Sequence, residues 1–198
     1  MKNAGLRKLG RFDIFPVDSS MPKYKKEYDR KIEPEEVQAM INKAKHPSHR
    51  FLIAVLYLTG ARSSEIVELK RRDFEIVGND LRIALRTKKG GRPRVLPFDL
   101  DSPFVRELIL PYLEQLPEAE SWALPFRTTP RVRQIIYETS GNTLCPYAFR
   151  HSRLTRLAED HATVPQLMMW KGSKDMSSVA DYLFLDPSHL NEFKRKIK

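Results

Sequence analysis

The sequence predicts an α+β fold that is mainly α, with a small three-stranded antiparallel sheet. Apolar residues recur at helical spacing through most of the chain, for example at positions 105, 108, 109, 112 and 113. One stretch, 74–97, instead changes to short strand-like runs separated by glycine-containing turns. Of the 198 residues, 41% are hydrophobic, which is enough for one substantial core.

Two regions of different character divide the chain. Residues 1–31 hold nine basic and four acidic residues together with Gly5, Gly10, Pro16 and Pro22, so we expect a basic N-terminal arm or linker. Residues 32–198 carry the periodic apolar pattern and are expected to form a single domain that ends in a basic helix at 187–198.

The expected elements follow from caps, breakers and periodicity. Pro34 and the glutamates after it suit a first helical turn, and the apolar run 51–58 suits a central core helix that ends at Gly60. The alternation at 81–86 between two turns predicts the middle strand of the sheet. We expect helices over 34–45, 51–58, 63–70, 104–116, 129–139, 146–160, 164–170 and 177–184, and strands over 74–77, 81–86 and 92–97.

The charge balance favours a polyanionic partner. The chain has 35 lysines and arginines against 25 acidic residues, a formal net charge of +10. Nucleic acid is the usual partner of such a protein, because each neutralised phosphate releases counterions. A basic surface without a ligand is an equally open alternative from charge alone. The basic residues are spread through the structured segments, which suits a binding face better than a tail.

Other classes of protein are disfavoured. The longest unbroken apolar run, 51–58, is far too short to span a bilayer, and no apolar signal segment follows Met1. The single cysteine, Cys145, permits no internal disulfide framework, and five scattered histidines make no metal template. We therefore expect a soluble cytoplasmic protein with no metal and no other cofactor.

Four separate segments offer groups that suit chemistry on a phosphate. They are 59–65 with Arg62 and Glu65, the hairpin 87–94 with Lys88, Lys89, Arg92 and Arg94, the helix start 146–151 with Tyr147, Arg150 and His151, and 172–182 with Ser173 and Tyr182. Each segment alone is more typical of an ordinary feature: a helix cap, a hairpin tip, an amphipathic helix and a half-buried tyrosine.

In this order and spacing, the four segments resemble the catalytic domain of the tyrosine recombinases, also called phage integrases, over residues 32–198. The resemblance implies that Arg62 and Arg150 are the two catalytic arginines, that Tyr182 is the nucleophile and that Lys89 is the hairpin lysine, with Lys88 as its neighbouring candidate. It also implies supporting roles for Glu65 and His151.

Two positions depart from the usual pattern of the family. Tyr147 stands where a histidine is common, and this Tyr-x-x-Arg form resembles a subgroup of integrases from archaeal plasmids and viruses. Ser173 stands where histidine or tryptophan is common. A serine hydroxyl can donate one hydrogen bond to a phosphate oxygen but is a poor general acid or base.

The resemblance implies a site-specific DNA recombinase or integrase of a mobile element that acts through a 3′-phosphotyrosyl intermediate without a metal. Its partners would be double-stranded DNA and further copies of this chain, as a tetramer on DNA and a monomer or weak oligomer in solution. We expect Lys88, Arg92, Arg94 and Arg153 to contact DNA. Two alternatives stay open: a weakened relative that only binds DNA, and a nicking-closing enzyme like the type IB topoisomerases.

Overall fold

The structure, a computed structural model, describes residues 31–87 and 91–183, and for Asp181 and Leu183 the backbone alone. In chain order its helices and strands are α1 (Pro34–Lys43), α2 (Pro47–Thr59), α3 (Ser63–Ile66), the 3-10 helix η1 (Arg71–Asp73), β1 (Phe74–Val77), β2 (Asp80–Leu85), β3 (Arg94–Asp99), the π-helix η2 (Val105–Ile109), α4 (Leu110–Glu114), α5 (Thr129–Thr139), α6 (Pro146–Glu159), α7 (Val164–Lys171) and α8 (Ser177–Leu183). The predicted fold class, mainly α with a small antiparallel sheet, is confirmed.

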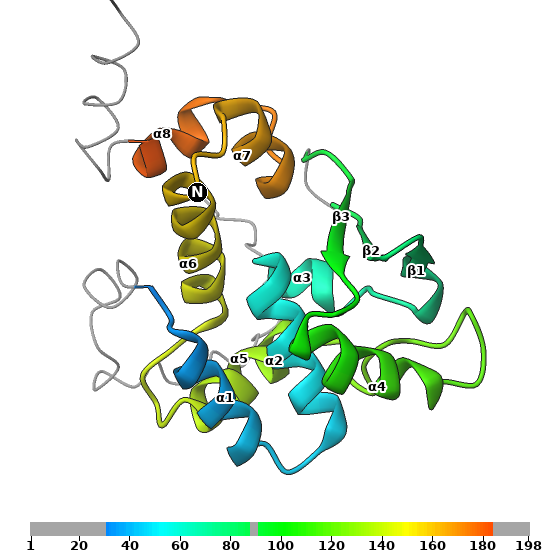
Figure 1. Cartoon of the computed structure of the whole chain (residues 1–198). Helices are drawn as coiled ribbons and strands as arrows, with labels where there is room; N and C mark the ends of the chain where they lie inside the picture. The colour runs from blue at the N-terminus through cyan, green and yellow to red at the C-terminus, as the bar shows by residue number, and fades with distance from the viewer. Residues whose placement is uncertain (1–30, 88–90, 184–198) are drawn as a thin grey trace, which may run out of the picture.

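Helix α2 is the centre of the main core. Every side chain from Phe51 to Leu56 is fully buried, as the apolar run predicted. Helices α1, α5 and α6 and the η2–α4 segment pack around it (Figure 1). Burial on all sides explains why 51–56 carries no polar side chain.

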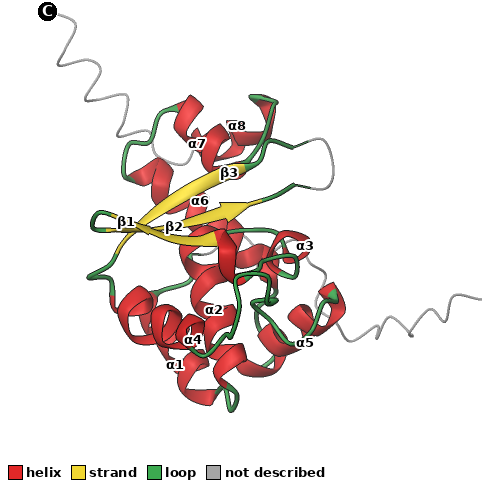
Figure 2. Cartoon of the chain, turned by 90° about the vertical axis from the view of Figure 1, so that its right-hand side faces the viewer, coloured by secondary structure: helices red, strands yellow, loops and turns green. Residues whose placement is uncertain are grey.

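The sheet is a meander with strand order β1-β2-β3, and both strand pairs are antiparallel (Figure 2). Leu81 and Ile83 of β2 pair with Phe98 and Leu96 of β3, and all four are buried on one face. The intervening Arg82 points to the other, exposed face, as the period of two requires.

Four elements differ most from the sequence-based expectation. Helix α2 begins at Pro47 rather than at 51, since proline is accepted in a first helical turn, and β3 runs over Arg94–Asp99 rather than 92–97. The helix expected over 63–70 ends at Ile66, because the chain beyond it pairs with the loop before α5: the N–H of Ala123 donates to the carbonyl of Leu69. The helix expected over 104–116 widens into the π-helix η2 directly before Pro111. Pro111, in the first turn of α4, has no N–H to donate to the carbonyl four residues earlier, so the α-helical hydrogen-bond pattern is interrupted in the segment before α4.

Helices α6, α7 and α8 enclose a second, smaller apolar cluster made by Leu154, Leu167, Val179 and Tyr182. Helix α7 also contacts β3, so the C-terminal helices lie beside the end of the β2–β3 hairpin at which β3 begins (Figure 1). The site residues of α6 and of the α7–α8 turn are thereby brought toward those of the α2–α3 turn.

Several expectations fall on parts of the chain outside the described residues. These are the basic arm except for Lys31, the hairpin lysines Lys88 and Lys89, and the terminal helix at 187–198. Within 31–87 and 91–183, no helix is both long enough and apolar enough to cross a membrane.

Candidate active site

The position of Arg62 is set by the way in which α2 ends. Gly60 caps α2 in the left-handed conformation with φ of 58° and turns the chain toward α3. Arg62 then precedes the first turn of α3, with its side chain 45% exposed and Nη1 3.5 Å from Oε1 of Glu65. The backbone N–H of Arg62 donates to Oε2 of Glu65 at 2.8 Å. Glu65 therefore contacts both the backbone N–H and the guanidinium of Arg62. Its supporting role stays a prediction.

Arg150 is fixed from two sides on α6. Its side chain donates through Nη1 to the carbonyl of Gly60 at 3.0 Å and through Nη2 to the carbonyl of Lys171 at 2.6 Å. Burial, and then the positive charge of Arg62, lower the pKa of Arg150 to about 10, so the guanidinium stays charged at neutral pH. Two cations that repel one another in this way form a site for an anion.

Arg62 and Arg150 meet at a small pocket of about 140 Å³, whose lining residues are Ala61, Arg62, Ser63, Pro146, Tyr147 and Arg150. Tyr147 lies one helical turn before Arg150 and is 54% exposed. Three of the predicted catalytic residues thus share one pocket.

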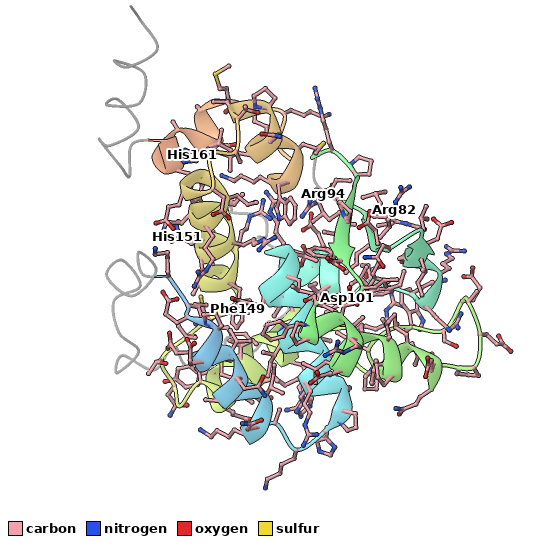
Figure 3. All side chains as sticks on the ribbon, in the orientation of Figure 1. Arg82, Arg94, Asp101, Phe149, His151 and His161 are labelled. Carbon is pink, nitrogen blue, oxygen red and sulfur yellow. The ribbon has the colours of Figure 1, made fainter. Side chains whose placement is uncertain are left out.

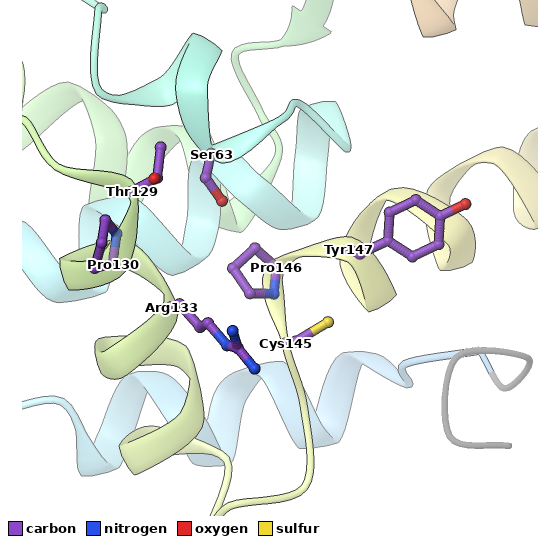
Figure 4. A pocket seen from close by; sticks show the side chains of 7 residues that line it. All are labelled: Ser63, Thr129, Pro130, Arg133, Cys145, Pro146 and Tyr147. Carbon is purple, nitrogen blue, oxygen red and sulfur yellow. The ribbon is translucent and has the colours of Figure 1, made fainter. Parts of the chain in front are cut away.

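A larger hollow of about 420 Å³ adjoins this pocket. It is lined by Ser63, Thr129, Pro130, Arg133, Cys145, Pro146 and Tyr147, three of which it shares with the smaller pocket (Figure 4). In Figure 4 the ring of Tyr147 stands at one side, and its hydroxyl points away from Ser63 and Arg133. The two hollows form one depression that runs past the N-terminal end of α6.

Tyr182 lies on α8 and is only 4% exposed, inside the second apolar cluster. Its ring centroid is 5.4 Å from that of His151 on α6, and Nζ of Lys171 is 5.2 Å from the ring centroid. Tyr182 also contributes, behind burial and other charges, to the pKa of Arg150, so its phenol lies within electrostatic range of the site.

The hydroxyl group of Ser173 makes hydrogen bonds within the α7–α8 turn. Its Oγ accepts hydrogen bonds from the Asp175 N–H at 3.2 Å and from Oγ of Ser178 at 2.7 Å. Ser173 is not among the residues that line either hollow. Lys171, two residues before Ser173, contacts the site more directly through its carbonyl and its ammonium group. Sequence spacing alone did not place it there.

The structure does not support one of the predicted DNA contacts. The side chain of Arg94 is 2% exposed and paired with Glu65, so it cannot face a DNA backbone (Figure 3). Arg153 is partly buried, with its guanidinium 4.7 Å from the ring centroid of Trp170, and its contact with DNA stays a prediction. Arg92 is exposed and stays a predicted contact, whereas Lys88 lies outside the described residues.

The part of the chain that the structure describes holds no group of three or more histidine, cysteine or acidic side chains arranged to bind a metal ion. The side chains that line or adjoin the two hollows carry guanidinium, phenol, imidazole, ammonium and hydroxyl groups.

Comparisons with known proteins concern the sequence and the fold of this chain. The model of the phage integrase family matches residues 30–189. The tyrosine recombinase XerD of Staphylococcus aureus (strain Mu50 / ATCC 700699) is 26% identical over 189 aligned positions, which cover 86% of this chain and 63% of XerD. The chain thus spans less than two thirds of the length of that relative.

Among solved structures, the XerH site-specific recombinase bound to its difH substrate is similar with a TM-score of 0.62 and 20% identity, covering 83% of this chain and 53% of XerH. The catalytic domain of bacteriophage HP1 integrase is similar with a TM-score of 0.59 and 15% identity, covering 83% of this chain and 93% of that domain. At these identities the likeness concerns the fold.

Proposed function

Since the chain belongs to the phage integrase family, whose model matches residues 30–189, we propose that it cuts and rejoins DNA at specific sites through a 3′-phosphotyrosyl intermediate. The observation that carries this proposal is the meeting of Arg62, Tyr147 and Arg150 at one pocket. A backbone phosphate is the anion of duplex DNA, and the pocket offers it two guanidinium groups that stay charged at any working pH.

In the first step, the phenol oxygen of Tyr182 attacks the phosphorus and forms a phosphotyrosyl ester, while the bond to the 5′ oxygen breaks. Charge grows on the non-bridging oxygens as the transition state forms, and Arg62 and Arg150 stabilise it. His151, whose ring lies beside that of Tyr182, is our candidate acceptor of the phenol proton. Because Tyr182 is buried between α6, α7 and α8, we expect α8 to shift when DNA binds.

The departing 5′ oxygen needs a proton, and we propose that Lys89 supplies it. The ester keeps the energy of the broken phosphodiester bond, so a second 5′-hydroxyl can reverse the step without ATP. Because the arginines neutralise the phosphate, we propose that the reaction needs no metal ion.

Tyr147 is proposed to donate its hydroxyl to the phosphate in the place where a histidine is common in the family. This Tyr-x-x-Arg pattern supports a finer proposal, that the chain comes from an integrase of an archaeal plasmid or virus. We further propose that the protein acts inside the cell and assembles as a tetramer on duplex DNA, with Arg92 among its phosphate contacts.

The test uses a library of duplexes that carry one nick at a fixed position, flanked by randomised sequence. A strand cut within a few nucleotides of the nick releases a short fragment that diffuses away, so the adduct is trapped. We expect a protein–DNA adduct in denaturing gels, and sequencing of the trapped DNA gives the preferred site. Tyr182→Phe should abolish the adduct while duplex binding persists. An adduct of unchanged yield in Tyr182→Phe would remove Tyr182 from its role.

A DNA-binding module without cleavage is the second candidate. It is favoured by the engagement of the Ser173 hydroxyl within its own turn and by the burial of Tyr182. Tight, salt-sensitive binding to duplex DNA with no adduct from any library member would select this candidate.

A further inference from the structure

Arg94 and Glu65 form an ion pair inside the protein, on the floor of the candidate site. Nη1 of Arg94 donates to Oε1 of Glu65 at 2.9 Å, and Nη2 donates to Oε2 at 3.0 Å. Both side chains are 2% exposed. The two parallel bonds fix the plane of the carboxylate as well as its position.

The same carboxylate holds Arg62. Its Oε2 accepts from the backbone N–H of Arg62 at 2.8 Å, and its Oε1 lies 3.5 Å from Nη1 of Arg62. An exposed arginine side chain has many rotamers of similar energy, and the anchored carboxylate favours those that direct the guanidinium toward the pocket. Glu65 can do this only while its own orientation is set by Arg94.

Arg94 also ties the hairpin to the α7–α8 turn. A Cβ atom added to Gly172 would lie 2.7 Å from Nη1 of Arg94, so the guanidinium packs directly on the backbone of that glycine. Next to it, the N–H of Arg92 donates to the carbonyl of Gly172 at 3.1 Å. Arg94 thus contacts both the turn that precedes the helix of Tyr182 and the carboxylate that holds Arg62.

We propose that Arg94 is a positioning residue for cleavage, which acts on Arg62 through Glu65 and fixes the α7–α8 turn against β3. This inference rests on the proposed function of the site, and it replaces the sequence-based prediction that Arg94 contacts DNA.

The electrostatics of Glu65 agree with this role. Burial raises the pKa of Glu65, but the hydrogen bonds and charge of Arg94, the N–H of Arg62 and the charge of Arg150 together bring it below its usual value. Without Arg94, the buried carboxylate would lose its fork of donors and would take up a proton more readily.

The test is a double-mutant cycle on the rate of adduct formation with the trapped duplex, measured on fully bound protein. We expect Arg94→Leu to slow cleavage about 30-fold in the wild-type background and less than about threefold in the Arg62→Ala background. Arg72→Leu, which removes an arginine from the exposed pair with Glu120, is the matched control and should keep the wild-type rate. An equal slowing by Arg94→Leu in both backgrounds would overturn the proposal.

A second variant protects the test against loss of folding. Arg94→Lys keeps the charge but offers Glu65 no planar fork, so we expect a folded protein whose cleavage is slowed several-fold and whose duplex binding is unchanged. Wild-type cleavage kinetics in folded Arg94→Lys would contradict the proposal.

A readout without DNA separates this inference from the proposed function. In ¹⁵N NMR of the arginine side chains, the Nε–H signal of Arg62 should lose order in Arg94→Lys and keep it in Arg72→Leu. If the wild-type chain forms no adduct but this loss of order occurs, the proposed function fails while the link from Arg94 to Arg62 stands. Unchanged order of Arg62 in Arg94→Lys would overturn the link itself.

Discussion

Nη1 of Arg150 donates a 3.0 Å hydrogen bond to the carbonyl oxygen of Gly60, although 90 residues separate the two in the chain. The bond joins α6 to the C-terminal end of α2, and it points a buried cation at the turn that carries Arg62. The lack of a side chain at Gly60 makes the close approach possible, because a Cβ atom there would lie 3.3 Å from Cα of Arg150.

Replacing Arg150 with lysine tests whether cleavage needs the planar guanidinium with its several N–H donors, or only a positive charge. A lysine cannot bond the carbonyls of Gly60 and Lys171 together with a phosphate, so we expect Arg150→Lys to slow adduct formation by about 100-fold or more. Duplex binding, measured by fluorescence anisotropy in a Tyr182→Phe background, should change by less than about threefold, since the contact strengthens only as charge develops. A wild-type cleavage rate in Arg150→Lys would show that a point charge is sufficient.

Alanine substitutions at Gly60 and Gly78 separate two costs in stability, that of close packing at the end of α2 and that of backbone strain. Gly60 and Gly78 have similar positive φ angles, 58° and 62°, but a Cβ at Gly78 meets nothing within 4 Å. Gly78→Ala should therefore cost only the strain of a left-handed alanine, about 1–2 kcal/mol of unfolding free energy in urea titrations.

Gly60→Ala adds contacts with Cα of Arg150 and Cβ of Arg153, so its loss of stability should be larger by about 1 kcal/mol or more. It should also slow cleavage, which Gly78→Ala should leave unchanged. Equal losses in the two variants would contradict the close packing of α6 on Gly60.

The sequence predicted the bounds of those helices and strands that depend only on neighbouring residues. The strand Phe74–Val77 and the helix Thr129–Thr139 have the predicted bounds, because alternation or helical periodicity and flanking breakers settle them without reference to the rest of the chain. The helix expected over 63–70 was too long, since its end depends on pairing with a loop that comes 50 residues later.

The candidate site was predictable where spacing along one helix brings groups together, as for Tyr147 and Arg150. The role of a site residue was not predictable where it depends on a contact with a residue far away in the sequence. The partner of Arg94 is Glu65 on another element, and a basic hairpin gives no sign of it. One signal did exist: Arg94 has the same parity along its strand as Leu96 and Phe98, so alternation assigns it to the buried face.

The acid dependence of stability should report on the ionised state of Glu65. Burial raises the pKa of Glu65, but Arg94, Arg62 and Arg150 face it and bring the pKa below its usual value. The stabilising effect of ionised Glu65 is therefore fully present above the pKa of the unfolded chain, about 4.3, and is lost as the pH falls through the lower folded value.

We expect wild-type protein to be more stable than Glu65→Gln at pH 6–7 and the difference to shrink steadily below about pH 4. Urea titrations at a series of pH values measure it, and Glu75→Gln on the exposed side of β1 controls for the removal of one negative charge. A stability difference independent of pH would mean that the charge of Glu65 contributes nothing to the folded state.

Tyr147→Phe removes a single hydroxyl from the rim of the pocket and isolates its chemical role. Tyr147 is 54% exposed, so the loss of its hydroxyl should change the unfolding free energy by less than about 0.5 kcal/mol. If the hydroxyl donates to the phosphate during cleavage, adduct formation should slow by about 10–100-fold at unchanged duplex affinity.

Tyr137→Phe on α5, outside both hollows, is the matched control. Tyr147→His should recover most of the rate, because an imidazole can supply the same hydrogen bond. Equal cleavage by Tyr147→Phe and wild-type protein would leave the hydroxyl without a role, and the two guanidinium groups alone would then stabilise the transition state.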